Sequence, residues 1–88
     1  MQVTFRSSFL RDLKKIKDQR LLDRIDRAIE SGEQATDLHE LSDLKKLSGF
    51  HDFYRIRIGD YHLGIALADK AIEFVRCLPR KEMYRFFP

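Results

Sequence analysis

The second half of the chain alternates between apolar and polar residues in runs that predict consecutive β-strands. Three such runs follow one another, at residues 53–58, 61–68 and 71–78. Two-residue turns, Gly59-Asp60 and Asp69-Lys70, are expected between them. The last run is the most apolar, which favours a central place in the sheet, and Pro79 ends it. A shorter strand is expected at residues 44–47, followed by a turn or bulge at Ser48-Gly49.

The start of the chain combines a short strand with an amphipathic helix. Residues 2–6 alternate and predict a first strand, after which Ser7 or Ser8 is expected to cap a helix that ends near Lys17. The apolar side chains of this helix form one stripe: Phe9, Leu10, Leu13 and Ile16.

A second helix is expected to begin after Asp18, as its N-cap, and to stop at Gly32. Its apolar stripe comprises Leu21, Leu22, Ile25, Ala28 and Ile29. Because almost no linker separates the two helices, they predict an antiparallel hairpin laid on one face of a sheet. Residues 37–40, DLHE, have the pattern of a capping box and predict a single helical turn.

These elements predict an α+β fold in a single domain that spans residues 1–88. The expected architecture is a small, antiparallel-rich sheet with an N-terminal strand, a two-helix hairpin packed on one face, and a three-stranded C-terminal meander. A length of 88 residues suits one domain. With 43% apolar residues and charges of mixed sign, the composition does not indicate disorder.

Strand alternation sorts the side chains of the meander onto two faces. The apolar set is expected in the core: Tyr54, Ile56, Ile58, Tyr61, Leu63, Ile65 and Leu67. Arg55 and Arg57 then share the other face, and their backbone positions are about 6.6 Å apart. This distance is on the scale of successive phosphates on one nucleic-acid strand. His62, Gly64 and Ala66 lie on the same face of the next strand. We expect this face to be open, cationic at one end and nearly bare at the other. The bare residues would let a nucleotide lie close to the backbone, although Gly64 in a strand can equally mark only a bend.

The charge distribution favours an anionic partner for that face. Residues 1–43 contain 8 Lys or Arg against 9 Asp or Glu, whereas residues 44–88 contain 9 against 5. The basic excess therefore lies entirely in the half that carries the arginine strand. This favours a nucleic acid over a merely solvated surface.

The sequence also bears on location. Cys77 stands alone in an apolar run, which predicts a buried thiol and excludes an internal disulfide. No stretch approaches the roughly 18 apolar residues that a membrane span needs, and the first residues lack a signal-peptide core. We therefore expect a cytoplasmic protein without membrane contact.

Three short motifs occur in order along this layout: KKLSG at 45–49, FYRIRIGDYH at 53–62 and PRKEMYRFFP at 79–88. Together with the order strand, helix hairpin, meander and basic tail, they resemble the RelE/ParE toxin superfamily of bacterial type II toxin–antitoxin modules. Within that superfamily they lie nearest the RelE-like mRNA interferases. The resemblance covers essentially the whole chain. It implies a toxin that enters the decoding site of a translating ribosome, cleaves the messenger RNA there without a cofactor, and forms a hetero-oligomer with a cognate antitoxin protein.

The resemblance also implies catalytic roles for particular side chains: Arg55, Arg57, Arg80 and Tyr84. His62 stands where relatives usually carry an arginine after the tyrosine of the hairpin. Leu78 and Pro79 replace the glycine and polar residue that many relatives carry before the late arginine.

RNA cleavage through the 2′-hydroxyl needs in-line placement, a proton acceptor, charge stabilisation and a proton donor, but no metal. The arginines stay protonated and suit the stabilisation of a phosphorane. The general base is left open between His62, which has a suitable pKa and lies on the right face, and Tyr84, whose pKa neighbouring cations would have to lower. The remaining basic side chains are expected to bind RNA: Lys45, Lys46, Lys81 and Arg85.

The three histidines His39, His51 and His62 lack a metal-ligand spacing, so no metal site is predicted. His51 is expected in a loop. Two other functions remain open: a ParE-like toxin that inhibits gyrase by binding it, and a non-catalytic RNA- or ribosome-binding module. Neither depends on the full set of candidate catalytic side chains, which distinguishes both from an endoribonuclease.

Overall fold

The computed structural model describes residues 1–47, 49 and 52–88. Within these residues, five strands form one mixed sheet in the order β1-β5-β4-β3-β2. The strands are β1 (Gln2–Phe5), β2 (Leu44–Lys46), β3 (Phe53–Ile58), β4 (Tyr61–Ala68) and β5 (Ala71–Pro79). The helices are α1 (Ser7–Lys14), α2 (Gln19–Gln34), the one-turn 3₁₀ helix η1 (Leu38–Glu40) and α3 (Arg80–Phe86). The predicted α+β fold is therefore confirmed, with β1 parallel to β5 and the other pairs antiparallel.

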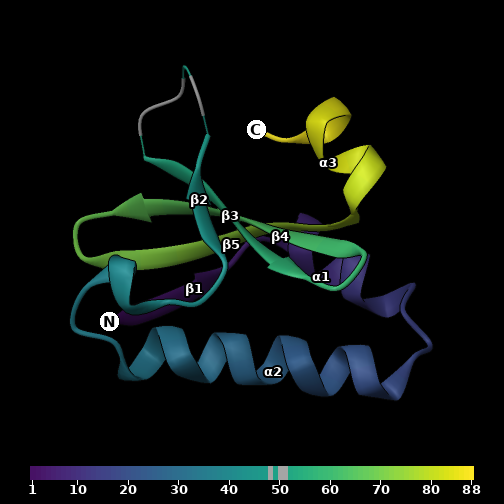
Figure 1. Cartoon of the computed structure of the whole chain (residues 1–88), viewed down its shortest axis with the longest axis horizontal. Helices are drawn as coiled ribbons and strands as arrows, with labels where there is room; N and C mark the ends of the chain where they lie inside the picture. The colour runs from purple at the N-terminus through teal and green to yellow at the C-terminus, as the bar shows by residue number, and fades with distance from the viewer. Residues whose placement is uncertain (48, 50–51) are drawn as a thin grey trace.

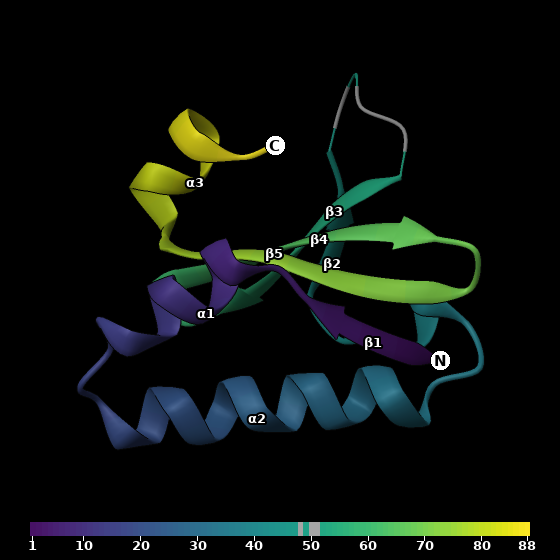
Figure 2. The same cartoon turned by 180° about the vertical axis from the view of Figure 1, so that it is seen from behind.

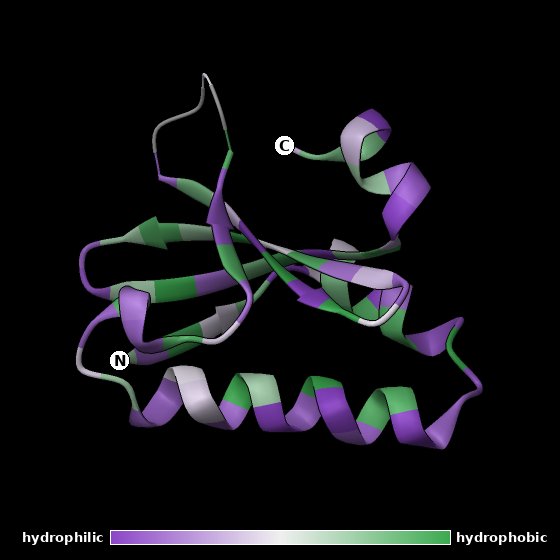
Figure 3. Cartoon of the chain, in the orientation of Figure 1, coloured by the Kyte–Doolittle hydropathy of each residue, from purple (hydrophilic) through white to green (hydrophobic). Residues whose placement is uncertain are grey.

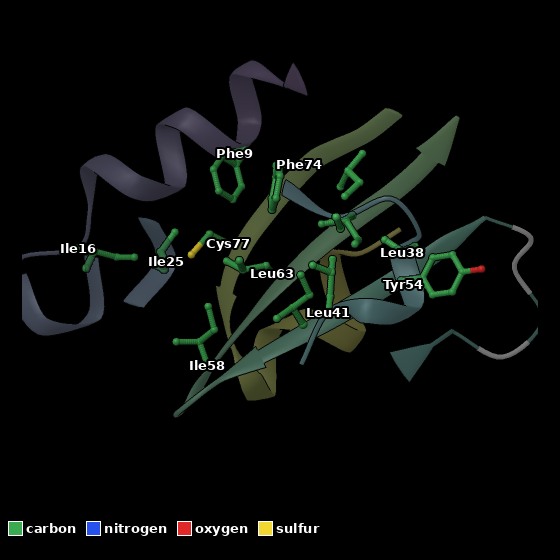
Figure 4. Close-up of a cluster of buried hydrophobic side chains, with 14 residues drawn as sticks. Phe9, Ile16, Ile25, Leu38, Leu41, Tyr54, Ile58, Leu63, Phe74 and Cys77 are labelled. Carbon is green, nitrogen blue, oxygen red and sulfur yellow. The ribbon is translucent and has the colours of Figure 1, made fainter. Parts of the chain in front are cut away.

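The sheet has helices on both faces (Figures 1 and 2). Helices α1 and α2 cover one face and enclose the main hydrophobic core, in which Phe9, Ile25, Leu63 and Phe74 are almost fully buried (Figure 4). The long helix α2 alternates apolar and polar segments along its length, as Figure 3 shows, because one side faces this core and the other faces solvent.

The C-terminal helix α3 lies on the other face, which strand alternation alone predicted to be open. Met83 and Phe87 pack there against Val75 and Leu78 of β5, and the four residues form a second buried cluster. The side chains of β4 and β5 that do not face α1 and α2 therefore also contribute to a small core.

The strands of the meander occupy the residues that alternation predicts. The register pairs Tyr54 with Ile65 and Ile56 with Leu63 on the core face, and Arg57 with His62 on the opposite face. Both predicted turns are present, and Asp69 and Lys70 both have positive φ, at 48° and 65°. The expectation of a central β5 is wrong, because β4 occupies the middle of the sheet. Of the expected turn or bulge at 48–49, Ser48 lies outside the described residues.

The predicted helix ends are confirmed in part. Asp18 caps α2 by accepting from the N–H groups of Arg20 and Leu21, and the capping box around η1 is present. The prediction of a serine cap for α1 is wrong: Arg6 occupies the N-cap position, and the Ser8 hydroxyl donates to the Val75 carbonyl instead. That helix also ends three residues before Lys17.

The prediction that Gly32 stops α2 is wrong as well. The helix continues to Gln34, and a Cβ built on Gly32 would lie 3.2 Å from the Ile72 side chain. This glycine allows helix and sheet to approach each other closely and does not end the helix.

A β-bulge in β5 changes which face of the sheet the side chains after it point to. Gly64 pairs with Arg76 and Ile65 pairs with Phe74, so Val75 is an extra residue without a partner on β4. As a result, Phe74 and Cys77 both face the main core, although they are three positions apart, and Leu78 faces α3.

Candidate active site

Five side chains form the candidate site: Arg55, Arg57, His62, Arg80 and Tyr84. The antiparallel register places Arg55 opposite Gly64 and Arg57 opposite His62, so both arginines lie on the face that α3 partly covers. Arg57 is exposed and Arg55 is half-buried.

Helix α3 brings the other two members to the same place. Arg80 and Tyr84 are four residues apart, so they lie on one side of this helix. The start of α3 is attached to the tip of the β3–β4 hairpin, because the Arg80 N–H donates to the Asp60 carbonyl at 2.7 Å. Within the described part of the chain, no carboxylate forms an ion pair with Arg55, Arg57 or Arg80. Their positive charges are therefore available to an anionic ligand.

His62 lies beneath this arginine cluster and is only 1% exposed. Neither ring nitrogen has a hydrogen-bond partner in the described structure. Burial lowers the pKa of His62, and the positive charges of Arg55, Arg80 and Arg57 lower it further. The imidazole is therefore neutral at pH 7.

Tyr84 lies above His62. The two rings meet edge to face, with centroids 6.4 Å apart and planes at 83°. Tyr84 is 69% exposed, so most of its surface remains available for a ligand. The site therefore presents an exposed phenol in contact with a buried imidazole, and three guanidinium groups lie close enough to that imidazole to affect its charge.

The expectation of an open, nearly bare face beside this site is wrong. Phe87 covers Gly64, and Ala66 packs against the cluster that contains Phe87. The small side chains on β4 accommodate the C-terminal segment of the same chain, so a nucleotide has no access to the backbone there.

The four predicted RNA-binding residues do not lie together. Lys45 pairs with Arg55 and so lies on the face of the candidate site, whereas Lys46 pairs with Tyr54 and lies on the other face. Lys81 lines a cleft with Arg80 and Tyr84. Arg85 is exposed on α3, with its guanidinium 5.5 Å from the ring centre of Phe86.

The other histidines lie apart from the candidate site. His39 is exposed on η1 and contacts the Asp37 carboxylate at 2.9 Å. His51 lies outside the described residues. In the described part of the chain, no three His, Cys, Asp or Glu side chains gather in an arrangement that could hold a metal ion. Likewise, no helix among those described is long and apolar enough to cross a membrane.

A buried ion pair that the sequence pattern did not predict supports the β5 bulge. Asp12, 5% exposed, accepts hydrogen bonds from Arg76 at 2.8 and 3.1 Å and from the Cys77 N–H at 2.9 Å. Ser8 lies one helical turn earlier and bonds the Val75 carbonyl. The sequence did offer one indication, because Asp12 interrupts the apolar stripe of α1. Its partner Arg76, however, is 64 residues away and could not be identified from local pattern.

Comparison with known proteins identifies the family. The family model described as the ParE toxin of type II toxin–antitoxin systems, parDE, matches residues 3–84. The chain belongs to this toxin family. It is 39% identical to Toxin RelE3 of Methanocaldococcus jannaschii over the full length of both chains.

Solved structures of RelE toxins have the same fold. The RelB–RelE antitoxin–toxin complex from Methanococcus jannaschii matches with a TM-score of 0.83 and 38% identity, covering 97% of this chain and 99% of the other. The RelE–RelB complex from Pyrococcus horikoshii OT3 matches with a TM-score of 0.73 and 25% identity, covering 90% and 93%. The chain is therefore a type II toxin of the RelE kind.

Proposed function

We propose that this toxin is a ribosome-dependent endoribonuclease that cleaves messenger RNA in the decoding site and so stops translation. The observation that carries the proposal is the gathering of Arg55, Arg57 and Arg80 around His62, whose ring contacts the exposed Tyr84. None of the three arginines pairs with a carboxylate of the described structure. A surface that only had to bind a protein would not need three uncompensated guanidinium groups beside an exposed phenol.

The chemistry follows from the properties of these groups. The 2′-hydroxyl of the message attacks the adjacent phosphorus, its proton passes to a general base, and the bond to the 5′-oxygen breaks as that oxygen is protonated. Negative charge accumulates on the phosphoryl oxygens during this step. Arg57 and Arg80 are assigned to stabilise it, because both are exposed whereas Arg55 is half-buried, and because guanidinium groups remain charged and donate to two oxygens at once.

The burial of His62 favours Tyr84 as the group that exchanges protons with RNA. A side chain that is 1% exposed has no direct access to a 2′-hydroxyl, whereas Tyr84 is 69% exposed. We assign His62 the role of a positioning residue, because its ring contacts Tyr84 from below.

The ribosome supplies orientation that the toxin lacks. The candidate site offers charge stabilisation and one accessible proton carrier. A ribosome that holds the message bent would place the 2′-hydroxyl in line with the phosphorus, and such orientation contributes on the order of 7 to 11 kcal/mol in favourable cases.

We also propose a cognate antitoxin as a partner in a hetero-oligomer. The two RelE structures described above were solved with RelB. An acidic antitoxin segment would pair with the free arginines of the candidate site and prevent RNA from reaching them.

Primer extension tests the proposal. A message is incubated with the toxin either naked or in programmed ribosomes, and the expected result is discrete cuts within codons only on the ribosome. Arg57→Ala and Arg80→Ala should each reduce the single-turnover rate by 10²-fold or more, while Arg20→Ala, an exposed arginine at the start of α2, should not change it. Equal cleavage of naked and ribosome-bound RNA would contradict the role of the ribosome.

Gyrase inhibition is the second candidate function, because the matching family model carries the ParE name. A DNA supercoiling assay with purified gyrase distinguishes the two. Inhibition of supercoiling without any cut in the message would replace the endoribonuclease proposal.

A further inference from the structure

His62 is a buried histidine without a hydrogen-bond partner. Its side chain is 1% exposed, and within the described structure neither ring nitrogen forms a hydrogen bond. Most buried polar groups in proteins are paired, because an unpaired donor away from water is unfavourable. A neutral imidazole carries one N–H and an imidazolium carries two. A second proton would therefore add both a charge and another unpaired donor to a buried site.

The charged groups that face His62 also oppose a second proton. Burial lowers the pKa of the imidazole most, and the positive charges of Arg55, Arg80 and Arg57 lower it further. Two of these arginines come from β3 and one comes from α3. On the β5 side, His62 pairs with Leu78, which is apolar. Among the described residues, no carboxylate pairs with these arginines or shifts this pKa upward.

Helix α3 covers His62 on the face of the sheet that carries the arginines. The ring of Tyr84 meets the imidazole edge to face, with the ring centroids 6.4 Å apart. The other neighbours belong to the sheet, since β4, which carries His62, is paired with β3 on one side and with β5 on the other. Movement of α3 is therefore the simplest way for water to reach the imidazole.

Helix α3 is also the most easily displaced of the elements around His62. It has seven residues, whereas isolated helices shorter than about 12 residues are marginal in water. Its anchors are Met83 and the following Phe87 in the second buried cluster, and the Arg80 N–H, which donates to the Asp60 carbonyl. The main hydrophobic core, as far as the structure describes it, contains no residue of α3. Detaching this helix would leave that core in place.

We propose that His62 is an acid-sensitive latch for α3: protonation of its imidazole detaches the C-terminal helix from the sheet, and deprotonation allows it to dock again. Detachment carries Arg80 and Tyr84 away from Arg55 and Arg57, so the candidate site is assembled only while the ring is neutral. The latch is a property of the protein alone and does not depend on the reaction that the site performs.

The linkage between the proton and the helix sets the size of the effect. The docked state holds the pKa of His62 below its ordinary value, whereas in the detached state the imidazole is hydrated and its pKa returns toward about 6.5. At a pH between these two pKa values, only the detached state binds the second proton, so acid favours detachment. The ratio of detached to docked molecules should rise about tenfold for each unit by which the pH falls.

An NMR titration of the free toxin from pH 7 to pH 5 tests the latch. The ring signals of His62 report its protonation, the nuclear Overhauser effect between the rings of His62 and Tyr84 reports docking, and the amide signals of residues 80–87 report the helix. We expect all three to change together with one midpoint, while the amide signals of α2 keep their folded positions. The original spectrum should return when the sample is neutralised.

Three results of this titration would overturn the proposal. Protonation of His62 with an unchanged Overhauser effect to Tyr84 would show that an imidazolium is accommodated beneath a docked helix. Loss of the α2 signals in the same step would show global unfolding and not a local event. An unchanged spectrum down to pH 5 would show that the latch does not open. The experiment contains neither RNA nor ribosomes, so its failure is distinguishable from failure of the proposed endoribonuclease function.

His62→Phe is the informative variant, because it keeps an aromatic ring beneath Tyr84 that cannot be protonated. Its α3 signals should remain at their docked positions at pH 5. His39→Phe is the matched control: His39 is exposed on η1, outside the site, and this variant should lose α3 docking as the wild type does. Detachment of α3 in His62→Phe at the same pH as in the wild type would assign the acid response to another group. If His62→Phe does not fold, the wild-type titration decides by itself.

Discussion

The ring of Phe87 rests on Gly64, so closely that a Cβ at Gly64 would lie 2.8 Å from the ring Cγ. The strand pairing at this position is regular on the β3 side, where Gly64 pairs with Arg55. The glycine is therefore required by the contact with the C-terminal segment. Because this contact fixes the end of α3, it also fixes Tyr84, three residues before Phe87.

Gly64→Ala should destabilise the protein by about 1–3 kcal/mol, because the added methyl group overpacks the contact with Phe87. In a Phe87→Ala background the same substitution should cost nothing or stabilise slightly, since alanine is better than glycine within a strand. Urea unfolding of the wild type, the two single variants and the double variant measures the coupling. An equal cost of Gly64→Ala in both backgrounds would show that the two residues do not interact.

Asp12→Ala should lower the free energy of unfolding by roughly 3 kcal/mol or more. The substitution leaves Arg76 without its carboxylate and the Cys77 N–H without its acceptor. The control is Asp26→Ala, an exposed acid on α2, which should change stability by less than about 0.5 kcal/mol. Similar midpoints for both variants in urea would contradict the importance of the buried pair.

The protein should lose stability as the pH falls below about 6.5, because the pKa of His62 is lowered in the folded state relative to its ordinary value. At a pH between the pKa of His62 in the folded chain and its pKa in the unfolded chain, the imidazole is protonated only in the unfolded chain. Acid therefore favours unfolding. The groups facing His62 that contribute are Arg55, Arg57 and Arg80, with Tyr84 above the ring.

Thermal melting between pH 7 and pH 5 tests this expectation. His62→Phe, which cannot be protonated, should show a smaller loss of Tm over this range than the wild type, while His39→Phe, at an exposed position outside the site, should behave like the wild type. The same loss in His62→Phe as in the wild type would assign the acid sensitivity to other groups.

Cys77 should react very slowly with thiol reagents while the protein is folded. The side chain is 2% exposed, and burial, with a smaller contribution from Asp12, raises its pKa to about 12. At pH 8 almost none of it is thiolate, which is the reactive form. Reaction with dithionitrobenzoate should be fast in concentrated urea and slow in buffer, and a fast reaction in buffer would contradict the burial.

Local patterns in the sequence predicted the meander well. Alternation placed Arg57 and His62 on one face, and the register confirms this pair. Period-two patterns are reliable here because one face of each strand is packed against α1 and α2, which excludes other registers.

Contacts between distant residues explain what the sequence did not reveal. The two glycines Gly32 and Gly64 looked like a helix stop and a bare surface, but each permits the close approach of a side chain, Ile72 and Phe87 respectively. His62 was expected to be accessible because alternation gives the face of a residue, and not what covers that face. Here α3 covers it.

The β5 bulge makes the arrangement of the site depend on the number of residues in the strand as well as on their identity. Without the extra residue at Val75, alternation would turn Leu78 toward α1 and α2 and Cys77 toward α3, and the start of α3 would leave the sheet on the wrong side. A substitution at this position changes packing, whereas a single deletion would separate Arg80 and Tyr84 from Arg57. An insertion or deletion in this strand should therefore be tolerated only when a second one restores the count.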